Sequence, residues 1–399
     1  MVVQVCSALL RSAVASRPTV ASIFRLHGPA YLHRHLLAPA QAKVLRAVIA
    51  CRTSALGGHV DTCLDCGHTH AAFNSCCDRH CPGCQASAAK KWTEGRLARV
   101  LPTHYFHVVF TLPAPLRPVA LANPKLIYDL FFAAANETLQ ELAKTRLDAQ
   151  FGITAVLHTW TRDLQFHPHL HCVVTGGGLS QDGTRWVACR DAFLFPVKVM
   201  GALFRGKFLD GLTRLAKLER LRFTGTSSHL TDPRAFAKMR SALYRTAWVV
   251  YAKRPFGGPK QVIEYLSRYT HRVGISNSRI RTVTNDAIVI STRGSRTCTL
   301  RPEEFIRRFL LHVLPAQFRK IRHYGLLAPA NVKSRLVTAR TCLDAAGHRY
   351  DTRLFEPGEL PGDLPSVPPA QELRCDACGG SNVRRERVPA DARGPPETP

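Results

Sequence analysis

The chain has 399 residues, enough for two or three domains, and its 55 Lys and Arg residues far outnumber its 28 Asp and Glu residues. The resulting formal net charge of +27 indicates a polyanionic partner, most often nucleic acid. No apolar run approaches the ~20 residues that a membrane-spanning helix needs. The composition therefore excludes a membrane-embedded protein and favours a soluble protein that binds nucleic acid.

Residues 1–50 are predicted to form a basic helical arm. No acidic residue precedes Asp61. The stretch ASIFRLHGPAYLHRHL is expected to be a helix broken at Gly28 and Pro29, and LAPAQAKVLRAVIAC a second helix.

Residues 51–95 are predicted to be a small zinc-binding domain. Hydrophobic periodicity stops here, and the segment has too few apolar residues to fold by burial without a metal. Most of the 14 cysteines lie in close pairs among histidines, which indicates metal ligation in a reducing compartment rather than disulfides.

Two C-x2-C pairs in this domain carry the strongest spacing signal. Their pattern is that of a four-cysteine structural Zn2+ site formed by Cys63, Cys66, Cys81 and Cys84. A second site of mixed ligands is predicted from Cys51, His59, Cys76 and His80, with Cys77, His68 and His70 as competing ligands. The domain is interpreted either as a DNA-contacting module or as a zinc staple that holds the fold together.

Residues 96–330 are predicted to be an α+β domain. Strands are expected over HYFHVVFTLP, GITAVLHTW and HPHLHCVVT, and a hairpin over SRIRTVTNDAIVISTRG, turning at Asn285 and Asp286. Helices are expected over NPKLIYDLFFAAANETLQELAK, capped by Asn123, and around AFLFPVKVMGALFRGKFLDGLTRL, DPRAFAKMRSALYRTAWVVYA and GPKQVIEYLSRYTH. Residues 331–399 are expected to be a disordered tail apart from the pair Cys375 and Cys378, which is half a metal site and is inert unless Cys342, His348 or another subunit supplies the remaining ligands.

The stretch FHPHLHC places His167, His169 and His171 at alternate positions of an expected strand. Their side chains then point to the same face of the sheet. A row of neutral imidazoles suits a divalent metal. The alternative is a half-buried strand whose histidines hydrogen-bond locally, and other residues must decide between the two.

The stretch YLSRYTHR places Tyr265 and Tyr269 four residues apart, so that on a helix they share a face. Such pairs usually pack in a core. Here charged side chains crowd the same helix and suit the binding of a DNA phosphodiester instead: Arg268, His271 and Arg272. A phenol is a poor nucleophile near neutral pH unless a cation polarises its target or a base takes its proton.

A His-hydrophobe-His strand followed by a tyrosine helix resembles the HUH endonucleases. Six blocks in order resemble, more specifically, the IS91-family two-tyrosine transposases: FRLHGPAY, ACRTSALGGH, NSCCDRHCPGCQ, HTWTRDLQFHPHLHCVV, YLSRYTHRVGISNSRI and FLLHVLPAQFRKIRHYG. The resemblance implies an α+β fold, in which a small zinc-binding module precedes an HUH core with an antiparallel sheet.

The resemblance also implies roles for individual residues. His169 and His171 would bind Mg2+ or Mn2+, and Tyr265 and Tyr269 would be the nucleophiles. A third ligand is common in such enzymes, and Gln261 is the candidate. His167 is the competing ligand, and His158, on the neighbouring strand, is expected to orient a ligand.

The implied activity is nicking and joining of single-stranded DNA, at element ends and target, through 5′-phosphotyrosine intermediates in rolling-circle transposition. Residues 176–178, three glycines, are interpreted as a loop that lets the DNA backbone approach closely. Two alternatives remain open: an HUH replication initiator, and a zinc-dependent DNA-binding protein without catalysis. The protein is expected in the bacterial cytoplasm, on the nucleoid when bound to DNA, and its oligomeric state is open.

Overall fold

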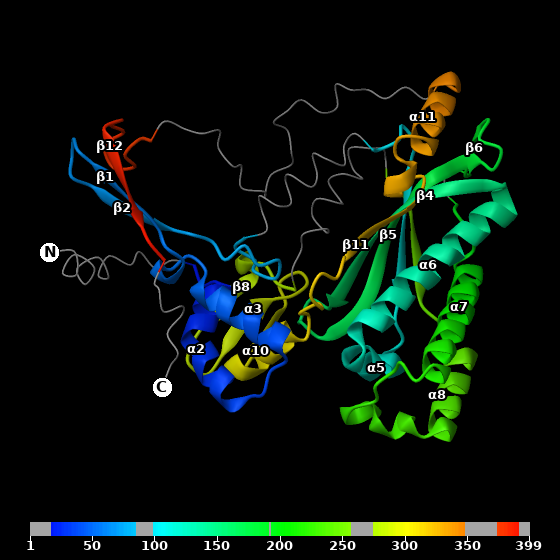
Figure 1. The fold of residues 1–399 in the computed structure, drawn as a ribbon, viewed down its shortest axis with the longest axis horizontal. Helices are drawn as coiled ribbons and strands as arrows, with labels where there is room; N and C mark the ends of the chain where they lie inside the picture. Colours follow the sequence, from blue (N-terminus) through cyan, green and yellow to red (C-terminus); the bar gives the residue numbers. More distant parts are fainter. Residues whose placement is uncertain (1–16, 85–98, 191–192, 257–273, 348–372, 391–399) are drawn as a thin grey trace. The chain divides into compact units, whose positions relative to one another are not determined.

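The computed structural model describes residues 17–84, 99–190, 193–256, 274–347 and 373–390. The chain divides into two compact units (Figure 1). The first unit contains residues 1–84, 275–310 and 370–399, and the second contains residues 85–274 and 311–369. Within the described residues, no helix has the length and apolar character that crossing a bilayer requires.

The second unit is built on a six-stranded antiparallel sheet, as expected for the α+β fold. The order of five strands is β11-β4-β5-β3-β7, and β6 pairs with β5. The strand bounds are β3 (Tyr105–Thr111), β4 (Ala149–Trp160), β5 (Phe166–Ser180), β6 (Trp186–Ala188), β7 (Val250–Phe256) and β11 (Ile321–Gly325).

One face of this sheet is covered by helices α6 (Pro124–Leu147) and α7 (Val197–Lys217) (Figure 1). Alternate residues of the three central strands supply the buried apolar side chains of that face, among them Phe106, Val108, Phe110, Ile153, Leu157, Leu170 and Cys172. The period of two follows from the pleat. It therefore directs the intervening residues, including the histidines, to the opposite face.

Shorter elements complete the second unit. They are α5 (Arg117–Ala122), α8 (Pro233–Arg245), α11 (Arg335–Ala345) and the 3-10 turns η3 (Ala114–Leu116), η4 (Gly225–Thr231) and η6 (Pro329–Asn331). Helix α11 packs its buried leucines with Leu179 and Leu326 in a small separate core. This helix corrects the expectation that residues 331–399 are disordered throughout.

Two other local expectations for the second unit differ from the structure. Asn123 precedes α6, but its side chain makes no capping hydrogen bond to the helix. Its side-chain Nδ2 instead donates to the backbone carbonyl of Arg222 at 2.7 Å, and its Oδ1 accepts from the backbone amide of Arg222 at 2.7 Å. The sequence following α8 was expected to continue as a helix through WVVYA, whereas β7 begins at Val250, because that segment pairs with β3.

The first unit contains helices α2 (Val20–Arg34), α3 (Pro39–Ala50) and α10 (Pro302–Leu310). Helix α2 is not broken at Gly28 and Pro29, as had been expected, but continues through both. A Cβ atom on Gly28 would lie 2.9 Å from Cδ1 of Ile49, so the glycine permits close packing of α2 on α3. The basic segment before residue 50 is thus, in its described part, a packed helical pair.

The expected hairpin, turning at residues 285–286, is formed by β8 (Ile280–Val283) and β9 (Ile288–Ser291), and β10 (Thr297–Leu300) extends it. The 3-10 turns are η2 (Ser54–Leu56) and η5 (Asn277–Arg279). These residues, 275–310, belong to the first unit, although the sequence placed them in the domain of residues 96–330.

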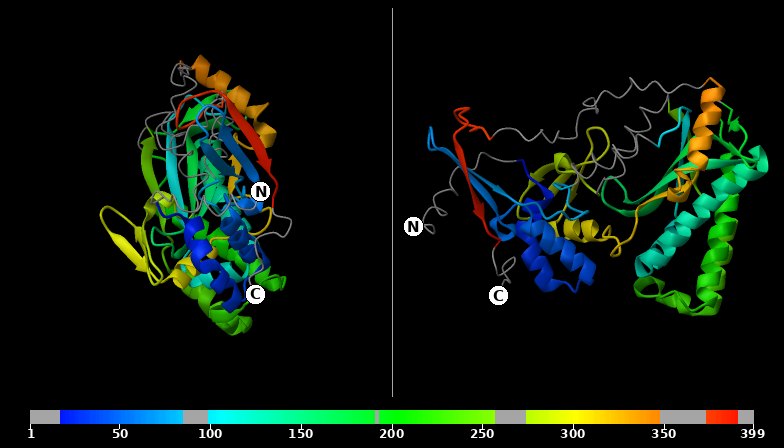
Figure 2. Two further views of the ribbon diagram at one scale, coloured as in Figure 1. Left: turned by 90° about the vertical axis from the view of Figure 1, so that its left-hand side faces the viewer. Right: turned by 45° about the horizontal axis from the view of Figure 1, so that its top comes forward.

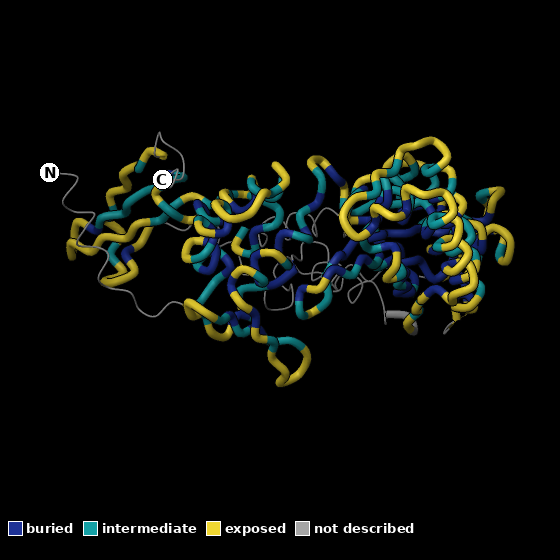
Figure 3. The backbone as a smooth tube through the Cα atoms, turned by 90° about the horizontal axis from the view of Figure 1, so that it is seen from below, coloured by how far each residue is buried: buried dark blue, intermediate teal, exposed yellow. Residues whose placement is uncertain are grey.

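A second three-stranded sheet of the first unit combines residues from both ends of the chain. Strands β1 (Gly58–Cys63) and β2 (Thr69–Phe73) form a hairpin, and β12 (Val383–Val388) pairs with β1 on its other edge (Figures 1 and 2). Strand β12 lies within the expected disordered tail, so it is a further correction. Most of this sheet is exposed or half-buried (Figure 3).

Candidate metal centres

Three histidines from two neighbouring strands of the second unit form one candidate metal centre. His169 of β5 stands directly opposite His158 of β4 in the strand register, and His171 lies two residues further along β5. Side chains two apart on a strand, and those directly opposite across a pair, share a face. One donor nitrogen from each histidine lies within 4.8 Å of the others.

The rings are packed against one another. The His158 ring centroid is 4.5 Å from that of His171 and 5.6 Å from that of His169. His158 is buried, and the two β5 histidines are half-buried. Burial lowers the pKa of His169 to about 4, so this imidazole is neutral near pH 7 and can offer a lone pair to a cation.

Hydrogen bonds orient two of these imidazoles. Nδ1 of His169 donates to the backbone carbonyl of His167 at 2.7 Å, which directs its Nε2 lone pair away from its own backbone. Nδ1 of His171 lies 2.8 Å from Nε2 of His107, a buried residue of β3. Such a partner fixes the tautomer and ring orientation of a metal-binding histidine.

His167 does not join this cluster. Its Nδ1 accepts a hydrogen bond of 2.8 Å from the guanidinium of Arg117, so its proton must be carried on Nε2. That tautomer presents no lone pair from Nε2. The alternate spacing along β5 therefore yields two clustered histidines rather than three, and His158 of β4 supplies the third.

Three imidazoles form a donor set that fits a divalent transition ion, with the remaining coordination positions left for water or substrate. Magnesium prefers oxygen ligands. The imidazole donors of the cluster therefore suit a divalent transition ion better than Mg2+.

Two cysteine clusters form further candidate centres in the first unit. One contains Cys51, Cys76, Cys81 and Cys84, and the other contains Cys63, Cys66, Cys375 and Cys378. In the first cluster the sulfur of Cys51 is 3.5 Å from that of Cys84 and 3.7 Å from that of Cys81. Hydrogen bonds lower the pKa of Cys51, with the largest contribution from Cys76 and the next from Cys81. The cluster thus stabilises a thiolate, which is the form that binds metal.

Comparison with known proteins bears on both kinds of centre. Residues 23–112 match the family model described as "Transposase zinc-binding domain", and residues 152–335 match the one described as "Putative transposase". The chain is 47% identical over 337 residues to "Putative transposase y4qJ" of Sinorhizobium fredii, an alignment that covers 82% of this chain and 85% of the relative.

The chain belongs to the IS91-family two-tyrosine transposases. It is also 29% identical over 303 residues to the transposase for insertion sequence element IS801 of Pseudomonas savastanoi pv. phaseolicola, which covers 72% of this chain and 70% of that one. No solved structure matches the chain. A member of this family acts on DNA and has nuclease and transferase activity. Family membership therefore favours a transposase over a replication initiator or a non-catalytic DNA-binding protein.

The zinc-binding domain of the transposase and its cysteine clusters support structural Zn2+. The structure regroups the ligands that the spacing had suggested. Cys63 and Cys66 do not meet Cys81 and Cys84, because the β1–β2 hairpin carries the first pair to β12. Cys81 and Cys84 meet Cys51 and Cys76 instead.

The two histidines expected in the mixed site lie outside both clusters. Nε2 of His59 is 3.7 Å from a carboxylate oxygen of Asp61, and Nδ1 of His80 is 3.0 Å from one of Asp78. Thiolates from Cys81 and Cys84 take the positions that these histidines had been assigned. Sequence spacing identified the C-x2-C pairs but gave no sign of which pairs meet.

The three glycines after the histidine strand also differ from expectation. Residues 176–178 are buried within β5 rather than in a loop open to DNA. A Cβ atom on Gly177 would lie 2.5 Å from the carbonyl oxygen of Val187, and one on Gly178 would lie 2.4 Å from that of Gln150. The glycines therefore allow close contact with β4 and β6.

The expected tyrosine helix lies outside the described residues. This applies to the nucleophiles Tyr265 and Tyr269, the ligand candidate Gln261, and the DNA-binding candidates Arg268, His271 and Arg272. Sequence reasoning gave His158 an orienting role and did not single out His107. Both residues alternate with buried apolar residues along their strands, and this alternation is the sequence pattern that could have placed them on the histidine face.

Proposed function

We propose that this transposase nicks and joins single-stranded DNA at element ends and target, through 5′-phosphotyrosine intermediates, in a divalent-metal-dependent rolling-circle mechanism. The observation that carries the proposal is the cluster of His158, His169 and His171 on one face of the antiparallel sheet. The charge of +27 supports a polyanionic substrate. The enzyme would work in the bacterial cytoplasm, on the nucleoid when bound to DNA.

The three histidines would hold Mn2+ or Mg2+, and His107 would keep the ring of His171 oriented. Such an ion supplies Lewis-acid polarisation of a scissile phosphate. Arg117 is hydrogen-bonded to His167, two residues before His169, and adds a positive charge near the start of β5. Burial lowers the pKa of His169, so an incoming cation meets a neutral imidazole at this ligand near pH 7.

Tyr265 or Tyr269 is the proposed nucleophile. The phenol oxygen forms a bond to phosphorus and loses its proton, the bond from phosphorus to the 3′ oxygen breaks, and that oxygen takes up a proton. The DNA 5′ phosphate remains esterified to the tyrosine. Attack by another 3′ hydroxyl reverses these changes and joins the strands without nucleotide hydrolysis. A second tyrosine permits a second cleavage while the first ester persists.

The test is incubation of the full-length protein with end-labelled single-stranded DNA from element ends and Mn2+, followed by denaturing electrophoresis. We expect a covalent protein–DNA adduct with wild type, and none with His169→Ala or His171→Ala, although both variants should still bind DNA. His229→Ala is a matched control, because His229 lies in η4 and outside the cluster. Normal adduct formation by both cluster variants would refute the metal assignment.

A further inference from the structure

The pairs Cys63/Cys66 and Cys375/Cys378 have the same local backbone structure. In the first, the amide of Gly67 donates to the carbonyl of Cys63 at 3.0 Å, and the amide of Cys63 donates to His68 at 2.9 Å. In the second, the amide of Gly379 donates to the carbonyl of Cys375 at 2.8 Å, and the amide of Cys375 donates to the carbonyl of Gly380 at 2.8 Å. Gly67 and Gly379 both have positive φ, +69° and +74°. Each pair is thus one zinc knuckle of the same type.

The four sulfurs of these knuckles have the spacing of a tetrahedral metal site. The Cys63 and Cys378 sulfurs are 3.6 Å apart, as are those of Cys66 and Cys375. A disulfide needs ~2.05 Å, whereas sulfurs bound to one Zn2+ by bonds of ~2.3 Å are separated by ~3.8 Å. All four cysteines are free thiols.

We propose that this transposase has a second structural Zn2+ site, shared between the two ends of the chain, with the ligands Cys63, Cys66, Cys375 and Cys378. Cys375 and Cys378 lie outside residues 23–112, the extent of the match to the zinc-binding family model. The site makes the C-terminal segment part of the zinc-binding domain.

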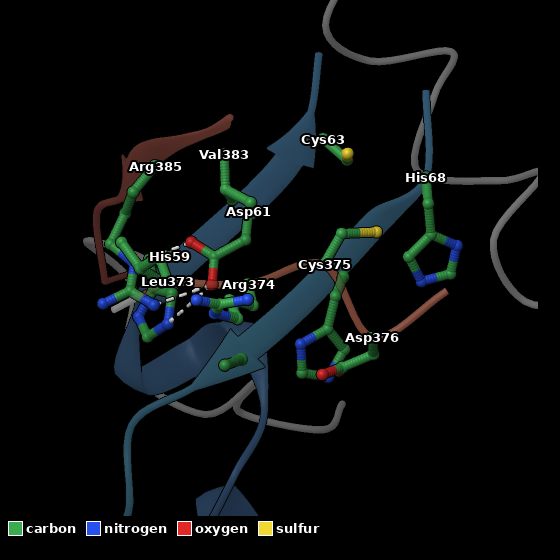
Figure 4. Close-up of a pocket in the computed structure, with 12 residues that line it drawn as sticks. His59, Asp61, Cys63, His68, Leu373, Arg374, Cys375, Asp376, Val383 and Arg385 are labelled. Atoms are coloured by element: carbon green, nitrogen blue, oxygen red, sulfur yellow. Dashed lines mark hydrogen bonds and ion pairs between the residues drawn. The ribbon is translucent and has the colours of Figure 1, made fainter. Parts of the chain in front are cut away.

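Backbone and side-chain contacts hold the two knuckles together. Strand β12 pairs with β1 from Gly58↔Val388 to Cys63↔Val383, so the pairing ends at a zinc ligand. The guanidinium of Arg385 donates two hydrogen bonds, of 2.6 and 2.7 Å, to the carboxylate of Asp61. Beside Cys63 and Cys375, a cavity of about 310 Å³ is lined by this ion pair (Figure 4).

The surrounding sheet has too little apolar burial to hold these segments by itself. All four inner residues of β12 are exposed, and β2 has no buried residue. The Asp61–Arg385 pair is partly exposed, and solvent screening makes the contribution of such an ion pair to stability small. Zinc binding by a four-cysteine site contributes far more to folding, so the metal is the main link between β12 and the hairpin.

The first experiment measures the zinc content of purified full-length protein by mass spectrometry of the metal. We expect two Zn2+ per chain in wild type and one in the variant Cys375→Ser/Cys378→Ser. Cys298→Ser is the matched control, because Cys298 lies in the same unit but outside both clusters, and it should retain two. Equal zinc content in wild type and the double variant would overturn the proposal.

A second measurement on wild type needs no folded variant. Cys66 and Cys378 are exposed, as is Cys77, which lies outside both clusters. If Zn2+ is bound, a thiol-alkylating reagent should modify Cys77 at once and spare Cys66 and Cys378 until prolonged treatment with a chelator removes the zinc. Immediate modification of Cys378 in the zinc-loaded protein, whether or not Cys66 is modified with it, would overturn the shared site. Neither measurement depends on DNA cleavage.

Discussion

Replacing His107 by Phe should weaken divalent-metal binding to the histidine cluster. The Nε2 atom of His107 is 2.8 Å from Nδ1 of His171, and the two rings stack with centroids 5.1 Å apart. Phe keeps an aromatic ring in this buried position but removes the nitrogen. One lost hydrogen bond costs about 1 kcal/mol, and loss of a partner that orients a metal-binding histidine lowers metal affinity ~10–100-fold. We therefore expect the dissociation constant for Mn2+ to rise ~10–100-fold.

The assay is calorimetric titration of full-length, zinc-loaded protein with Mn2+. His107→Gln, which can retain a side-chain hydrogen bond, should recover part of the affinity. His312→Phe is the matched control, because His312 is also buried and bonded, to Thr159 at 3.1 Å, but lies outside the cluster. Wild-type Mn2+ affinity in His107→Phe, or an equal loss in His312→Phe, would show that His107 does not orient a ligand.

Three further outcomes are expected. Tyr265→Phe and Tyr269→Phe should each still give a DNA adduct but fail in complete transposition, and the double variant should give none in the electrophoretic assay; an adduct from the double variant would place the nucleophile elsewhere. Brief treatment with a chelator should abolish cleavage while the zinc content stays constant, because thiolate sites hold Zn2+ more tightly than imidazoles hold Mn2+. Loss of zinc together with loss of cleavage would contradict the assignment of the two metals to separate cysteine and histidine sites. Gly177→Ala should lower the free energy of unfolding by ~1–3 kcal/mol, because the new Cβ would lie 2.5 Å from the carbonyl oxygen of Val187. Gly206→Ala should not lower it, because no atom beyond the neighbouring helix backbone lies within 4 Å of a Cβ there. Thermal unfolding of both variants measures the difference.

Periodicity predicted most of the central sheet. Alternation in HYFHVVFT and HPHLHC required one face to be apolar, and that face packs on α6 and α7. Periodicity failed where tertiary contacts decide the local structure. WVVYA could be helix or strand by composition, and pairing with β3 makes it a strand. Gly28 and Pro29 were expected to end a helix, but tight packing against Ile49 explains the glycine within it.

The candidate sites show the same division. Strand spacing brought His169 and His171 together, while the partner on β4 depends on an inter-strand register that the sequence does not specify. The spacing between cysteines identified knuckles, but pairing of knuckles is a long-range property. Cys66 and Cys375 are separated by 309 residues and meet because β12 adds to the edge of β1. The roles of Tyr265 and Tyr269 remain predictions from sequence.

The pairing of β1 with β12 has a consequence for biosynthesis. At ~5–20 residues per second, a ribosome needs roughly 15–60 s to add the 309 residues between Cys66 and Cys375. During that interval the nascent chain has made the hairpin knuckle but not its counterpart, and the strands of the histidine-bearing sheet, from β3 to β11, are synthesised within the same interval. Closure of the β1–β12 sheet therefore requires that translation has passed Val388, and a chain terminated before β12 would leave one edge of the β1–β2 hairpin unpaired.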